Sequence, residues 1–189
     1  MQATALKTLK PLRLVTAPPG EMETLFQNHH ARVFRTAHRI TGSAADAEDV
    51  LQTVFLRLIK GQESYDLSQN PEAYLSRAAI NASLDLLRSR TRSKSVGLDE
   101  VSAESLAGNL RNPEAEHADR ELQALIRKAV SRLGATAGEM FVLRYYEGYD
   151  NQEIARLTNT SALVVGVTLH RARTKLKKEI GHYLRAGQK

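Results

Sequence analysis

Apolar residues recur at steps of three and four positions along most of the chain, which predicts helices rather than strands. In the first half this pattern predicts three helices that can share one core. Gly42 ends the first helix and Ser43 caps the second. Asn70 and Pro71 begin a third, which is expected to run to about Arg90.

The periodicity fades from Thr91 to about Pro113, where Ser, Gly, Asn and acidic residues predict a flexible linker. Beyond it, Thr136 and Glu139 have the spacing of a capping box at the start of a helix. Asn159 fits a tight turn because asparagine tolerates the left-handed conformation. The further helices are expected over residues 122–133, 136–148, 151–158 and 161–184.

No segment alternates as a half-buried strand would, so the chain is expected to be all-α. We expect two small helical domains joined by a flexible acidic linker, the second carrying a helix-turn-helix. The expected divisions are an N-terminal arm at 1–20, a first domain at 21–92, the linker at 93–113 and a second domain at 114–189.

Charge is distributed unevenly along the chain, whose formal net charge is +6. Residues 77–94 hold five basic and one acidic residue, and residues 169–189 hold seven basic and one acidic. Residues 95–124, between these blocks, hold seven acidic and two basic residues. The pattern favours two modules that face a polyanion such as nucleic acid, although either block alone could be a solvated helix face.

Several classes of function are disfavoured by what the sequence lacks. There is no cysteine, so disulfides, cysteine zinc sites and thiol catalysis are excluded. His29, His30 and His38 have no acid at ligand spacing, so no metal site or cofactor is expected. We find no phosphate-binding glycine loop and no nucleophile–base arrangement, which argues against an enzyme. No apolar run could span a bilayer, so no membrane insertion is expected and the default compartment is the cytoplasm.

The segment from Asn151 to Ser161, followed by a basic amphipathic helix, has the form of a helix-turn-helix. Ala155 is small enough for two helices to cross closely, and Asn159 supplies the turn. Such a unit can place its second helix in the major groove of DNA, although similar segments also occur on the surface of ordinary bundles.

At this point the sequence resembles a known family, the extracytoplasmic-function (ECF) sigma factors of bacterial RNA polymerase. Residues 45–58 resemble the family's region 2 helix that binds the polymerase clamp. The resemblance implies that Asp46, Asp49, Gln52 and Phe55 face the polymerase. Asp46 also fits a plain structural role at the helix start.

Residues 73–92 are similar to the family's −10 recognition element. The resemblance implies that Asn81 reads a base of the melted non-template strand. Phosphates would be held by Arg77, Arg88, Arg90 and Arg92. Asp85 is expected to fix an arginine, because a carboxylate repels phosphate. For Asn81 the alternative is a structural hydrogen bond between two helices.

Residues 141–173 resemble region 4, which reads the −35 element. The expected DNA-binding residues are Ser161, Leu163, Thr168, Arg171, Arg173 and Lys175. The chain departs from the family at Gly166 and Thr168, where Lys and Arg are usual, so contacts to phosphate are expected to outweigh base reading.

The resemblance implies a sigma factor that binds core RNA polymerase and promoter DNA and is held by an anti-sigma factor. The alternative is a helix-turn-helix regulator that binds duplex DNA without polymerase.

Overall fold

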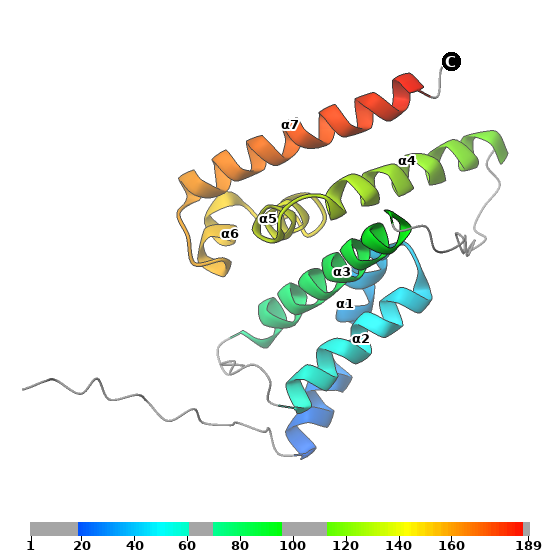
Figure 1. Cartoon of the computed structure of the whole chain (residues 1–189). Helices are drawn as coiled ribbons and strands as arrows, with labels where there is room; N and C mark the ends of the chain where they lie inside the picture. The colour runs from blue at the N-terminus through cyan, green and yellow to red at the C-terminus, as the bar shows by residue number, and fades with distance from the viewer. Residues whose placement is uncertain (1–18, 61–69, 96–112, 187–189) are drawn as a thin grey trace, which may run out of the picture.

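The computed structural model describes residues 19–60, 70–95 and 113–186, and these residues form helices joined by short turns, with no strand among them (Figure 1). The all-α expectation is therefore confirmed. The helices of the described part are α1 (Pro19–Thr41), α2 (Ala44–Ile59), α3 (Pro71–Ser95), α4 (Pro113–Ser131), α5 (Ala135–Tyr145), α6 (Asn151–Leu157) and α7 (Ala162–Ala186). The expected arm and linker fall largely outside the described residues.

Helix ends follow the local chemistry that the sequence predicts at Gly42, Ser43 and Asn70. Gly42 has a φ of 72°, and its N–H donates to the His38 carbonyl at 2.8 Å, which closes α1. Ser43 caps α2 by accepting from the Asp46 N–H, and Asn70 caps α3 by accepting from the Ala73 N–H at 3.0 Å. These caps satisfy amide groups that helix ends leave without partners.

The start of α6 and the turn between α6 and α7 also form as expected. Asp150 and Glu153 make a reciprocal capping box at the start of α6. Asn159 adopts a φ of 51°, which lets the chain reverse before Ser161.

The predicted capping box of Thr136 and Glu139 is wrong. The residue before α5 is Gly134, which has no side chain to cap the helix. Glu139 instead points away from its own helix end and is bonded to residues of α3. A local sequence pattern cannot predict a hydrogen-bond partner that lies more than fifty residues away in the chain.

Helices α1, α2 and α3 enclose the first hydrophobic core. The core contains four small alanines, which leave room for a close approach of the helices, and larger apolar residues fill the remaining space. The buried residues of this core are Val33, Ala37, Ala47, Val50, Val54, Phe55, Leu58, Leu75, Ala79 and Ala82.

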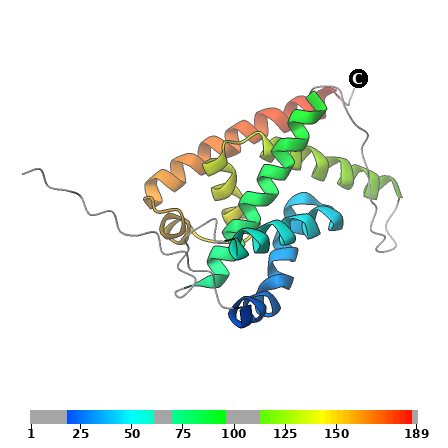
Figure 2. The same ribbon diagram turned by 60° about the horizontal axis from the view of Figure 1, so that its bottom comes forward.

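The second core joins the two halves of the chain. Ile40 of α1 and Ile80 and Leu84 of α3 belong to the same buried cluster as residues from α4, α5, α6 and α7. Helix α3 packs against α1 and α2 on one side and against α4 and α5 on the other (Figures 1 and 2). The two expected domains thus lie in direct contact, with α3 between them.

Two leucines of α3 provide a matched test of this arrangement. Leu75 is buried in the first core and Leu84 in the second. Changing either to Ala should lower the free energy of unfolding by about 2–5 kcal/mol, because each leaves a cavity. In hydrogen exchange, Leu75→Ala should raise exchange in α1 and α2, and Leu84→Ala in α4 and α5. Unchanged protection of α5 in Leu84→Ala would show that the second core does not join the halves in solution.

Candidate functional site

One side of α2 faces outward and combines polar and apolar side chains. Asp49 and Gln52 are exposed, and Leu56 and Ile59 are 50% and 54% exposed. Their spacing of three and four residues puts them on one side of the helix. We call these four residues the α2 outer face. Leu56 and Ile59 were not among the residues predicted from sequence.

Asp46 and Phe55, which the resemblance implied would face a partner, lie in the interior. Asp46 is buried and accepts two hydrogen bonds from the guanidinium of Arg90. Phe55 is buried and meets the ring of Phe26 edge to face, with centroids 4.9 Å apart. Arg90, predicted to hold phosphate, is therefore engaged in an ion pair inside the first half.

Arg77 and Asn81, one helical turn apart on α3, point toward α5. The Arg77 Nε lies 2.7 Å from Oε1 of Glu139, and the Asn81 amide donates to the same oxygen at 3.4 Å. Glu139 itself is buried. We call these three residues the α3–α5 contact. The alternative considered for Asn81, a hydrogen bond between helices, is what the structure contains.

Arg88 lies on the same side of α3 and is also partly covered by α5. It donates to Asp85 at 2.9 Å, so Asp85 does hold an arginine as expected. A Cβ at Gly138 would lie 3.1 Å from Arg88 Nη2 and 3.2 Å from Leu84 Cδ1. Glycine at this position thus permits the close approach of α5 to α3. Arg92 is exposed.

A second set of contacts joins α1 to the end of α5. Arg39 donates to the Tyr146 carbonyl and lies 3.2 Å from Glu147 Oε1, which also accepts from Thr36 at 3.3 Å. Beside them, Arg127 of α4 lies 2.6 Å from the position a Cβ would take on Gly42. Burial lowers the pKa of Arg127 below its usual value.

In the helix-turn-helix, α6 packs on α7 through Ala155, as the sequence predicted. The inward side of α7 carries Val165, Leu169, Ala172 and Leu176. The outward side of its first turns is apolar, with Leu163, Val164 and Val167 exposed. The last two were not predicted as site residues.

The six residues predicted to bind at the −35 element divide into two groups. Leu163, Arg171 and Arg173 are exposed and turned outward. Ser161 instead caps α7 by accepting from the Val164 N–H at 3.3 Å, Thr168 is half-buried, and the Lys175 ammonium donates to the Arg132 carbonyl at 2.6 Å.

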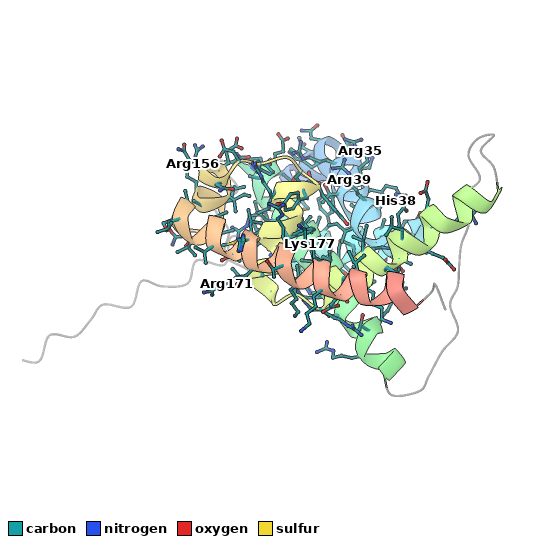
Figure 3. All side chains as sticks on the ribbon, turned by 90° about the horizontal axis from the view of Figure 1, so that it is seen from above. Arg35, His38, Arg39, Arg156, Arg171 and Lys177 are labelled. Carbon is teal, nitrogen blue, oxygen red and sulfur yellow. The ribbon has the colours of Figure 1, made fainter. Side chains whose placement is uncertain are left out.

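Figure 3 shows Arg156 of α6 with Arg171 and Lys177 of α7 on the helix-turn-helix, while Arg35, His38 and Arg39 come from α1. The ranges that the structure describes contain no group of three or more His, Asp or Glu residues able to hold a metal ion. Within the same ranges no helix is both long and apolar enough to cross a bilayer.

A basic helix-turn-helix in the second half of an all-helical protein is typical of DNA-binding proteins. Comparison with known proteins specifies the family. Residues 25–93 match Sigma-70 region 2 and residues 123–176 match Sigma-70, region 4.

The RNA polymerase sigma-E factor of Streptomyces coelicolor is 31% identical over 161 residues, which are 85% of this chain and 86% of that protein. The ECF RNA polymerase sigma factor SigW of Bacillus subtilis is 24% identical and covers 79% of this chain and 83% of its own length. The chain belongs to the ECF sigma factors of RNA polymerase.

Among solved structures, the sigma factor RpoE of Bartonella quintana, in complex with the anti-sigma factor NepR, has a similar fold. Its TM-score is 0.50 at 18% identity, covering 85% of this chain and 97% of that one.

The α3–α5 contact can be tested by reversing one charge. Glu139→Lys places an ammonium beside Arg77, so the two halves should separate. The natural chain has no cysteine, so spin labels at Arg57→Cys of α2 and Gln123→Cys of α4, both exposed positions, report the distance between the halves. Electron–electron double resonance should show longer and broader distances in Glu139→Lys.

The matched control is Glu179→Lys, since Glu179 pairs with Arg132 within the second half. It should leave the distance distribution unchanged. Identical distributions in the two variants would show that Glu139 does not hold the halves together.

Proposed function

We propose that this sigma factor binds core RNA polymerase through the α2 outer face, Asp49, Gln52, Leu56 and Ile59. The observation that carries the proposal is the exposure of Leu56 and Ile59 beside an acid and an amide. Protein interfaces commonly combine an apolar centre with a polar rim. Asp46 and Phe55 would act indirectly, by fixing the position of this helix.

The same proposal assigns promoter opening to α3. Asn81 would hydrogen-bond a base of the non-template strand, and Arg77, Arg88 and Arg92 would hold phosphates. Arg90 is left out because the buried carboxylate of Asp46 already engages its guanidinium.

Strand capture by α3 then requires that α5 moves away. Glu139 is an anion bonded to Arg77 and Asn81, so DNA and α5 compete for these two side chains. In this proposal the contact between the halves is a resting state, and the two halves separate when the chain binds core polymerase.

The second half would bind duplex DNA upstream, with Arg171 and Arg173 at phosphates. In this role the chain supplies binding rather than catalysis, and it acts where polymerase and DNA are, in the cytoplasm. An anti-sigma factor, like the one bound to the Bartonella quintana protein, would be a further partner.

Core binding is tested by the double variant Asp49→Lys, Gln52→Ala. Its affinity for core polymerase should fall about tenfold or more, since Asp49→Lys reverses the charge that the α2 outer face presents to the polymerase surface. Arg57→Ala, an exposed change on a different side of α2, should bind core normally. Helical circular dichroism should match in all three proteins. Equal affinity of the double variant and the natural chain would refute the α2 outer face.

Release of α3 is tested with the chain alone and a single-stranded oligonucleotide that carries the −10 sequence of a promoter mapped by run-off transcription. Glu139→Gln should bind this oligonucleotide about tenfold more tightly, because a charge-assisted hydrogen bond of about 1.5 kcal/mol or more no longer competes. Adding Asn81→Ala should remove most of that gain.

With core polymerase, Asn81→Ala should reduce permanganate-reactive thymines near the start site and leave the melting temperature nearly unchanged. A large fall in melting temperature would instead assign Asn81 a structural role. Tight binding of the natural chain to promoter duplex without core polymerase would favour the regulator alternative.

A further inference from the structure

The first turns of α7 expose three aliphatic side chains on the outside of the molecule. Leu163 is 78% exposed, Val164 47% and Val167 45%. We call these three residues the apolar α7 face. They do not contribute to the hydrophobic core, because Val165 and Leu169 fill the inward side of the same turns. Three neighbouring aliphatic residues in water indicate a partner that covers them.

The surroundings of the apolar α7 face favour DNA as that partner. Arg156 of α6 and Arg171 of α7 are exposed on the same helix-turn-helix (Figure 3). Arg173 of α7 is exposed as well, and the sequence has no acidic residue between residues 154 and 178. These exposed arginines complement phosphate backbones. In a helix-turn-helix the first turns of the second helix are also the part that enters the major groove.

Base edges in the major groove differ in what an aliphatic side chain can contact. Guanine, adenine and cytosine present hydrogen-bond donors and acceptors, and covering these with aliphatic carbon leaves them unsatisfied. Thymine adds a C5-methyl group, the apolar feature of that groove. The first cation of α7 is Arg171, so residues 162–170 offer no guanidinium or ammonium for reading guanine.

We propose that the apolar α7 face reads thymine methyl groups in the upstream promoter element, with Leu163 as the main contact. The inference rests on the proposed function of the second half as a duplex-binding module. It assigns sequence preference to van der Waals contact and burial, while Arg171 and Arg173 supply affinity that does not depend on sequence. Upstream elements bound by this factor should therefore contain thymines at fixed positions.

Replacing thymine by deoxyuridine tests this directly, because the exchange removes the methyl group and leaves the hydrogen-bonding edge intact. The probe is holoenzyme, core polymerase with the full chain, on a promoter duplex mapped by run-off transcription. Deoxyuridine at one contacted thymine should weaken binding about fourfold, the expected effect of exposing one buried methyl group. Replacing all upstream thymines should weaken it about tenfold or more.

A cycle of protein and DNA changes assigns the contact to its residue. Leu163→Ala, at an exposed position that should not affect folding, should weaken binding to the thymine duplex and bind the deoxyuridine duplex no less tightly than the natural chain does. Arg173→Ala is the matched control. It should weaken binding to both duplexes equally, keep the preference for thymine and reduce the slope of affinity against salt by about one phosphate contact.

Each negative result has a distinct meaning. If holoenzyme protects the upstream DNA but deoxyuridine changes nothing, the apolar α7 face does not read methyl groups and belongs to a protein partner. If deoxyuridine weakens binding equally in Leu163→Ala, another residue reads the methyl group and the assignment is wrong. If no holoenzyme forms, or no upstream DNA is protected, the proposed function fails and this inference with it.

Discussion

The ion pair between Arg77 and Glu139 holds α3 against α5 and so keeps one side of α3 covered. It joins a helix from each half of the chain, with Asn81 bonded to the same carboxylate oxygen. A buried carboxylate needs such partners, since an unpaired charge away from water is costly. In the proposed function, nucleic acid engages the side chains of Arg77 and Asn81 as well. Helix α3 therefore cannot be packed against α5 and open to a DNA strand at the same time.

Helix α3 also carries two sets of buried apolar residues, one on each of two neighbouring sides. Leu75 and Ala79 pack inside the first half and keep the three-helix unit together. Ile80 and Leu84 pack against the second half. Opening the molecule would expose the second pair to water, so the open state must be stabilised by whatever then covers α3. The first unit keeps its own core throughout.

Sequence periodicity was sufficient for the existence of the helices, for most of their caps and for the helix-turn-helix, because each depends on residues a few positions apart. It was insufficient where the partner lies far along the chain. Glu139 had the spacing of a local cap, yet its partner is in α3. In α2, nothing local in the sequence showed that Phe55 turns inward while Leu56 and Ile59 turn outward. The resemblance to a family pointed to particular helices, and only packing showed which of their side chains are exposed.

The ion pair between Arg90 and Asp46 affects how α2 and α3 are aligned with each other. Asp46 lies in the first turn of α2 and Arg90 in the last part of α3, so the two helices are tied together near these ends. One of them carries the proposed polymerase contact and the other the proposed strand contact. Their relative angle is then a property of one folded unit. If both proposed contacts form, the fold of the first half sets the distance between the polymerase surface and the captured DNA strand.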